Sequence, residues 1–153
     1  MTPEEKLAEL GIVLPEPPAA VAAYVPWLRT GQLVVTSGQL PLKDGQIVFA
    51  GKLGTDLTVE AGYQAARLCA LNAMAQLKAA AGELSRIRQV LRLEGNVHSA
   101  SGFQQQPQVL NGASELFNEV FGERAGHTRT ALGIYEMPLN AAVQLSVFAE
   151  LES

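Results

Sequence analysis

Residues 127–150, HTRTALGIYEMPLNAAVQLSVFAE, form the stretch around which the fold is organised. Two runs of alternating apolar and polar or small residues flank a Met-Pro-Leu-Asn break, which predicts a hairpin or a closely connected strand pair. Arg129 stands near the start of the first run. Because side chains alternate along a strand, Arg129 shares a face with Ala131 and Gly133, whereas Leu132 points to the other side. Small neighbours on its own face leave room for a ligand beside the guanidinium.

The elements that precede this stretch predict an α/β fold. Residues 32–49 read as a hairpin, because a β-branched run is followed by an Asp-Gly turn signal. A long helix is expected from Thr58 to Gly82, a long strand over residues 86–97, and a second helix from Pro107 to a stop at Gly122. This order predicts a two-layer sandwich, with a mostly antiparallel or mixed sheet of about six strands and two long helices on one face.

The N-terminal residues 1–19 are expected to form an extension, and residues 20–153 the domain itself. The sequence Thr-Pro-Glu-Glu at residues 2–5 has the pattern of a capped helix start. The prolines at residues 15, 17 and 18 then favour an extended linker. Residues 24–29 are typical of an edge strand, because Pro26 lacks the amide hydrogen that a central strand uses.

Composition limits the classes of function. With 48% hydrophobic and 17% charged residues, the 153-residue chain can bury a substantial core, and part of its apolar surface is expected between subunits, although composition alone does not separate a large core from an interface. A net charge of −4 argues against nucleic acid as a partner. The single cysteine and the lack of a membrane span or secretory signal predict a cytoplasmic protein with no membrane association.

The sequence offers no convincing metal or nucleotide cofactor site. Its two histidines, His98 and His127, and its single cysteine, Cys69, are too far apart in sequence to form a usual ligand cluster. No glycine-rich phosphate loop follows a strand. Cys69 lies on the apolar face of a predicted helix, where a small core residue is favoured over a nucleophile. We therefore expect neither a metal nor an organic cofactor.

Arg129 is the best candidate for chemistry, although a surface salt bridge is its simplest alternative role. A guanidinium binds a carboxylate through two parallel hydrogen bonds. Backbone amides expected to be free at Ser37 and Gly38 can hold a second oxygen or a water. Asn111 and Tyr24 can add polar contacts, although each taken alone is more often a helix-surface amide or a core aromatic.

Four segments together carry a resemblance to a known family. They are Tyr24 thirteen residues before Ser37, the run GQLVVTSGQLP at residues 31–41, the run VLNGASELF at residues 109–117, and HTRT at residues 127–130 followed by Met-Pro and an alternating last strand. In this order the chain resembles the RidA family (reactive intermediate deaminase, also YjgF-type or translation-inhibitor-like) over about residues 20–150. The resemblance implies a chorismate-mutase-like fold that assembles as a homotrimer with ligand clefts between subunits.

The resemblance also implies an activity. In deaminating members the arginine matching Arg129 grips the carboxylate of a 2-iminoacid or a 2-aminoacrylate-type enamine, and positions matching Tyr24, Ser37, Gly38 and Asn111 line the cleft. Water adds to the imine carbon, and ammonia leaves to give a 2-ketoacid, with no cofactor.

The chain departs from this pattern and resembles a divergent subgroup. The family's acidic residue that positions water falls at Gln144, and an amide can orient water but cannot take its proton. The family's cysteine falls at Ala131, a position that contributes mainly backbone contacts. Three functions stay open at this point: an imine deaminase that keeps or has lost efficient turnover, a trimeric binding or regulatory protein for small carboxylates, and, more weakly, an endoribonuclease or translation inhibitor.

Overall fold

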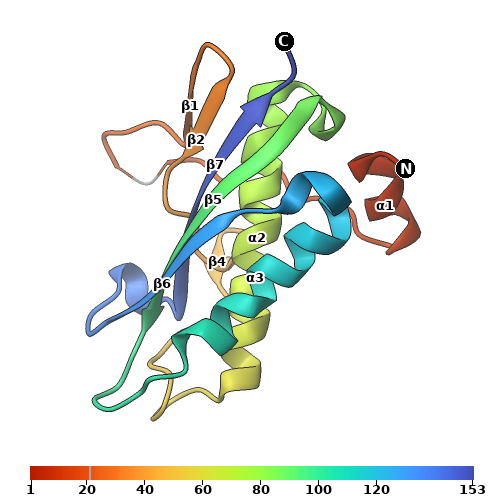
Figure 1. The fold of residues 1–153 in the computed structure, drawn as a ribbon. Coiled ribbons are helices and arrows are strands. Elements are labelled where there is room, and N and C mark those ends of the chain that lie inside the picture. The colour runs from red at the N-terminus through yellow and green to blue at the C-terminus, as the bar shows by residue number, and fades with distance from the viewer. Residues whose placement is uncertain (21) are drawn as a thin grey trace.

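The computed structural model describes residues 1–20 and 22–153 and shows a two-layer α/β sandwich (Figure 1). The main sheet has five strands in the order β1-β2-β7-β5-β6, and only β5 and β6 run parallel. Two long helices, α2 and α3, cover one face of this sheet, as predicted (Figure 1). The five strands are β1 (Trp27–Thr30), β2 (Leu33–Thr36), β5 (Ile87–His98), β6 (Thr128–Ile134) and β7 (Val143–Leu151).

Outside the main sheet the structure has three α-helices, a small ribbon and three 3-10 turns among the described residues. The α-helices are α1 (Pro3–Glu9), α2 (Val59–Ala81) and α3 (Gln106–Phe121). A separate two-stranded ribbon pairs β3 (Leu42–Lys43) with β4 (Gln46–Ile47). Three 3-10 turns complete the order: η1 (Leu84–Arg86), η2 (Gly122–Ala125) and η3 (Pro138–Asn140). No helix among the described residues has the length and apolar content needed to cross a bilayer.

The two strands of the 127–150 stretch form as predicted, but their pairing with each other was wrong. β5 lies between them, parallel to β6 and antiparallel to β7. The link over residues 135–142 contains η3, where Leu139 and Asn140 have positive φ angles, and it crosses the end of β5 instead of closing a tight turn. Alternation specifies a strand conformation but does not specify which strand becomes its neighbour.

The predicted hairpin over residues 32–49 was also wrong. β2 pairs with β1 and β7, and the turn that joins β1 to β2 contains Gly31 with a φ of 58°. The Asp44-Gly45 turn joins only β3 to β4, whose two-residue strands form their own small sheet. The expected six strands are therefore five in the main sheet and two in a ribbon beside it.

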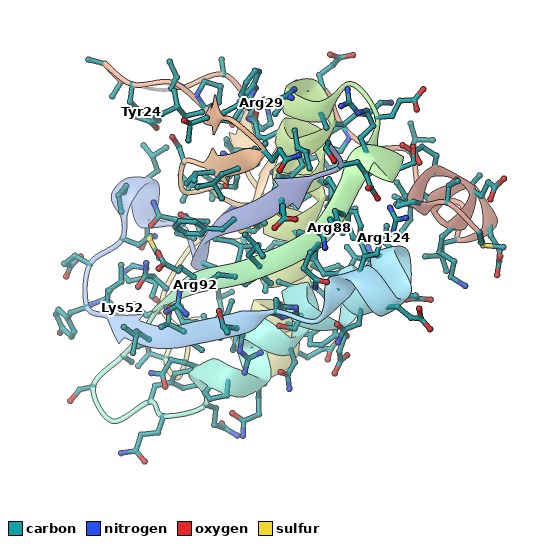
Figure 2. All side chains as sticks on the ribbon, turned by 45° about the horizontal axis from the view of Figure 1, so that its top comes forward. Tyr24, Arg29, Lys52, Arg88, Arg92 and Arg124 are labelled. Carbon is teal, nitrogen blue, oxygen red and sulfur yellow. The ribbon has the colours of Figure 1, made fainter. Side chains whose placement is uncertain are left out.

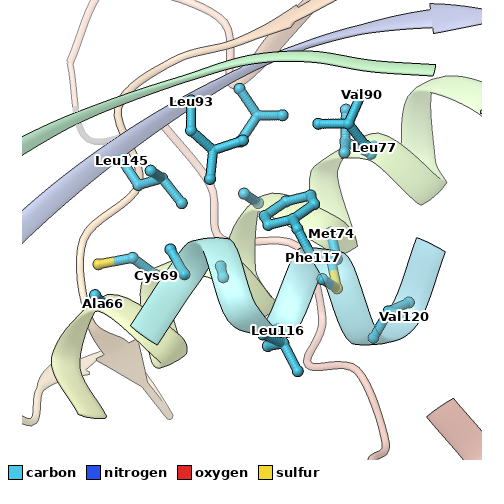
Figure 3. Close-up of a cluster of buried hydrophobic side chains, with 14 of the residues drawn as sticks. Ala66, Cys69, Met74, Leu77, Val90, Leu93, Leu116, Phe117, Val120 and Leu145 are labelled. Atoms are coloured by element: carbon cyan, nitrogen blue, oxygen red, sulfur yellow. The ribbon is translucent and has the colours of Figure 1, made fainter. Parts of the chain in front are cut away.

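The helices begin and end where their caps predicted. The Thr58 side chain accepts a hydrogen bond from the Ala61 amide at the start of α2, and Gly82 ends this helix with a φ of 89°. α2 is lined with small buried residues, so it packs closely against α3 and the sheet. Figure 3 shows the resulting core, in which Phe117 and Met74 lie beneath Leu93 of β5.

Replacement of the α2 cap tests this account of the helix start. We expect Thr58→Ala to lower the free energy of unfolding by about 1 kcal/mol, because one amide at the helix start loses its acceptor. Urea denaturation measures the change. Thr55→Ala is the matched control, since Thr55 is exposed and its side chain makes no hydrogen bond within residues 1–20 and 22–153. Equal losses in both variants would contradict the capping role.

The N-terminal extension packs against the domain. α1 begins with the predicted capping box, in which Thr2 and Glu5 bond to each other's backbone amides. Leu7 is buried in the same core as the sheet and the long helices. The Gln76 side chain of α2 donates to the carbonyl oxygen of Pro18. The division of the chain at residue 19 stays a prediction.

Candidate functional site

Arg129 lies on the helix-facing side of β6, which is an edge strand of the main sheet. In the parallel register it stands opposite Leu93, a core residue of β5. Ala131 follows on the same face and packs against the core, as the alternation predicted. The Arg129 Nη1 donates to Asn111 Oδ1 at 2.9 Å and to Ser114 Oγ at 3.2 Å, and both acceptors belong to α3.

Among the described residues, a single nitrogen of this guanidinium bonds to the protein. No carboxylate lies within ion-pair distance of Arg129 among residues 1–20 and 22–153. In that same part of the chain, Nε and Nη2 find no acceptor. The side chain is half-buried, so it holds a positive charge against α3 with one edge of its fork free. The salt-bridge alternative for Arg129 therefore finds no partner within the described chain.

A second group of the expected site residues gathers around the end of β2. Tyr24 and Gly38 line a hollow of about 30 Å³, together with residues of the N-terminal linker and the loop after β2. This volume holds about one water molecule. The described residues that line it are Pro18, Ala19, Ala20, Tyr24, Pro26, Gly38, Gln39, Leu40 and Leu42.

The two backbone donors expected at Ser37 and Gly38 differ. The Ser37 amide donates to the carbonyl oxygen of Pro26 at 2.8 Å, and its hydroxyl donates to the carbonyl oxygen of Val25. The prediction of a free amide at Ser37 was therefore wrong, because the segment before β1 returns to cover it. The Gly38 amide donates to no residue in the ranges 1–20 and 22–153, so it is the donor that remains for a ligand.

Gln144 lies against Gly38. A Cβ atom built on Gly38 would overlap the Gln144 side chain, so the glycine is what lets the amide lie across the start of the loop. Gln144 pairs with Asn96 of β5 and is half-buried on the face of the sheet that the helices leave uncovered. This is the face opposite to the one from which Arg129 projects.

The site residues therefore fall into two groups within one chain. Arg129, Asn111 and Ala131 lie on β6 and α3, whereas Tyr24, Ser37, Gly38 and Gln144 lie around β2 and β7. Two strands, β7 and β5, separate β2 from β6. At about 4.8 Å between neighbouring strands, β2 and β6 are about 14 Å apart. Figure 2 shows Tyr24 beside the β1 end of the sheet, away from Arg92 on β5, the neighbour of β6.

Comparison with known proteins identifies the family. A family model described as "YjgF/chorismate_mutase-like, putative endoribonuclease" matches residues 4–151. The chain belongs to this YjgF/chorismate-mutase-like family. The resemblance read from the four sequence segments and the expected chorismate-mutase-like fold are both confirmed.

Similar YjgF-type proteins cover almost the whole chain. Protein TCP17 of Trypanosoma cruzi is 42% identical over 148 residues, which are 96% of this chain and 92% of that protein. A crystal structure of a protein from Shewanella oneidensis MR-1, described as a putative endoribonuclease, is 46% identical, with a TM-score of 0.96 over 99% of this chain and all of that chain. A protein of unknown function from Agrobacterium tumefaciens is 43% identical, with a TM-score of 0.90 over 99% and 94% of the two chains.

Two residues next to Arg129 in this YjgF-type fold were missed by the sequence reasoning. Ser114 accepts from Arg129, and its Oγ also lies 2.9 Å from His127 Nε2. The His127 Nδ1 in turn bonds the carbonyl oxygen of Ala125. A signal was present, because Ser114 follows Asn111 by three residues on one helix face and His127 stands two residues before Arg129 on the chain.

Cys69 and His98, which the sequence also offered as candidate metal ligands or nucleophile, are both buried. Cys69 is fully buried in the core, and burial raises the pKa of its thiol well above the ordinary value. The thiol is therefore protonated at neutral pH, which agrees with the core role and not with a nucleophile. His98 is buried at the end of β5, where its Nδ1 bonds the carbonyl oxygen of Gly51.

Proposed function

We propose that this YjgF-family protein hydrolyses 2-iminoacids and the corresponding enamines, of the 2-aminoacrylate type, to 2-ketoacids and ammonia without a cofactor. The observation that carries the proposal is the free edge of Arg129. One nitrogen is held by two neutral acceptors on α3, and the remaining N–H groups have no partner in residues 1–20 and 22–153. A planar fork with a free edge suits a small carboxylate, which it can bind through two parallel hydrogen bonds.

The proposed reaction needs little beyond orientation and water. An enamine first takes a proton on carbon and loses one from nitrogen, which gives the imine. Water then adds across the carbon-nitrogen double bond, with its oxygen going to carbon and one of its protons to nitrogen. In the resulting adduct the amino nitrogen takes a second proton and leaves as ammonia, while the hydroxyl group gives up its proton as the carbon-oxygen double bond forms. Arg129 fixes the carboxylate, the Gly38 amide offers a hydrogen bond at the reacting end, and Gln144 orients the water. Tyr24 and Asn111 bound the site, and the backbone at Ala131 contacts the ligand.

We also propose that the complete site forms between copies of the chain in a homotrimer. The strand β2, beside which Tyr24 and Gly38 lie, is about 14 Å from β6 across β7 and β5, and Gln144 of β7 projects from the face opposite to Arg129. This separation supports a site that is completed by a second copy of the chain. The uncovered face and the β6 edge expose large apolar side chains, among them Leu28 (63% exposed), Leu132 (59%) and Tyr135 (64%). Such side chains are typical of surfaces that become buried on assembly.

The activity is tested with freshly generated 2-aminoacrylate and purified protein. We expect the 2-ketoacid to appear several times faster than in buffer, because hydrolysis in water also proceeds without a catalyst. Heat-unfolded protein at the same concentration is the control for nonspecific acceleration. A rate equal to that in buffer would contradict the deaminase function.

Mixing two inactive variants tests whether the site is shared. Arg129→Ala removes the guanidinium, and Gly38→Val places a side chain where the Gln144 side chain lies and so displaces it. If each cleft takes Arg129 from one chain and Gly38 from the next, random mixed assemblies restore about one quarter of the clefts, because each half is intact with even odds. The measurement is ketoacid formation after the variants are unfolded and refolded together. Separately refolded variants are the control, and no recovery in the mixture would place the site within one chain.

A binding protein without turnover is the second candidate, favoured by Gln144. An amide cannot accept the proton that water loses when it attacks. Calorimetry with 2-ketobutyrate and benzoate distinguishes the two: saturable binding without deamination favours the binding role, and no binding at all argues against both.

The family description and the description of the Shewanella protein raise RNA cleavage as a further candidate. The net charge of −4 gives little attraction for a phosphate backbone. RNA cleavage that survives extensive purification and disappears in Arg129→Ala would favour this activity over the other two.

A further inference from the structure

Arg129 is held by a hydrogen-bonded chain that reaches back to the start of its own strand. Ser114 is 8% exposed, and its hydroxyl lies 3.2 Å from Arg129 Nη1 and 2.9 Å from His127 Nε2. The His127 Nδ1 bonds the carbonyl oxygen of Ala125, in the turn between α3 and β6. The chain of contacts therefore runs from the guanidinium through Ser114 and His127 to the backbone.

These groups allow one consistent set of hydrogen-bond directions when the His127 ring is neutral. A carbonyl oxygen only accepts, so His127 carries a proton on Nδ1. In the neutral ring Nε2 is then an acceptor, and it takes the hydroxyl hydrogen of Ser114. The lone pairs of the Ser114 oxygen are left facing Arg129, which only donates. In this arrangement the donors and acceptors of the three side chains match one another.

We propose that Ser114 and His127 are positioning residues that hold the Arg129 guanidinium in the orientation that receives a ligand carboxylate. Neither residue touches the ligand in this role. Nη1 is anchored at Asn111 and Ser114, and this anchoring turns the free edge of the fork outward. The effect on ligand affinity rests on the proposed function, whereas the effect on the guanidinium itself does not.

The competing role for these residues is purely structural, namely tying α3 to the start of β6. Nitrogen NMR of the Arg129 guanidinium separates the two, because it measures rotation about the Nε–Cζ bond. We expect rotation to be severalfold faster in Ser114→Ala than in the wild type, since Nη1 loses an acceptor. Ser146→Ala is the control, because Ser146 lies on the opposite face of the sheet. Unchanged rotation in Ser114→Ala would overturn the proposal.

A matched pair of variants at His127 tests the same chain without altering Ser114. The amide of glutamine reaches the place of Nε2, so His127→Gln keeps an acceptor for the Ser114 hydroxyl. The shorter asparagine reaches the place of Nδ1, so His127→Asn keeps only the bond to the backbone of Ala125. We expect fast guanidinium rotation in His127→Asn and slow rotation in His127→Gln. Equal rotation in both would overturn the proposal even where Ser114→Ala fails to fold.

Ligand binding then connects the positioning role to function. We expect the KM for 2-aminoacrylate, and the Kd for 2-ketobutyrate, to rise about fivefold to tenfold in Ser114→Ala with kcat unchanged, and Ser114→Thr to restore both. A lower kcat together with a lower melting temperature, with KM unchanged, would instead indicate the structural role and overturn the proposal. A further outcome is faster guanidinium rotation in the variants while the wild type binds no carboxylate. That combination would contradict the proposed function but support the positioning of Arg129.

Discussion

Arg129→Ala is expected to lower kcat/KM for 2-aminoacrylate deamination about a thousandfold. Two charge-assisted hydrogen bonds to the carboxylate, at about 2 kcal/mol each, amount to about 4 kcal/mol, and each 1.36 kcal/mol is a factor of ten in rate. The loss should be large because, among the described residues, no other cation bonds to Asn111 and Ser114 and could replace Arg129 at this place. Steady-state ketoacid formation measures it.

Two further variants make this result specific. Arg129→Lys keeps the charge but lacks the planar fork, so we expect a loss that lies between those of the wild type and the alanine variant. Arg88→Ala removes an exposed arginine near the start of β5 that pairs with Glu150, and we expect its activity to match the wild type (Figure 2). If Arg129→Ala behaves like Arg88→Ala, the carboxylate clamp is assigned to the wrong residue.

The helices could be predicted from sequence because their ends are determined by neighbouring residues. Thr58 and Gly82 bound α2, and the glutamate that completes the capping box of α1 lies three residues from Thr2. Each signal acts within one turn of chain, so a single sequence contains all of the information.

Strand pairing and the state of the Ser37 amide depend on distant residues, and both predictions were wrong. β5 enters between β6 and β7 from more than thirty residues earlier in the chain than β6. The carbonyl oxygen of Pro26 reaches Ser37 only because β1 and β2 pair in the observed register. Alternation describes one strand at a time and carries no record of these partners.

The sequence named the individual candidate site residues, but it did not predict that they fall into two separate groups within one chain. The face of Arg129 followed from period-two alternation and agrees with the register of β6 against β5. That Tyr24 and Gly38 lie across two strands from Arg129 follows from strand order, which single-sequence reasoning did not give. The same strand order is what motivates a site shared between subunits.

Gln144→Glu is expected to raise kcat for deamination about a hundredfold, because it supplies the general base that the amide cannot be. The substitution keeps the length and shape of the side chain, which already lies against Gly38 on the uncovered face of the sheet. The new carboxylate acts only when ionised, so the gain should appear as pH rises through its titration and then level off. The wild type should not show that rise.

The comparison that decides the role of position 144 uses three variants in one assay. Gln144→Asn keeps an amide but withdraws it from Gly38, and we expect a lower kcat with little change in KM. Gln144→Ala tests whether the amide orients water at all. Since Gln144 projects from the face opposite to Arg129, none of the three should alter calorimetric binding of 2-ketobutyrate by more than about twofold. A Gln144→Glu enzyme no faster than the wild type at any pH would show that water is activated elsewhere. The Gly38 amide and the Arg129 fork would then be left to account for the whole acceleration by orientation and charge alone.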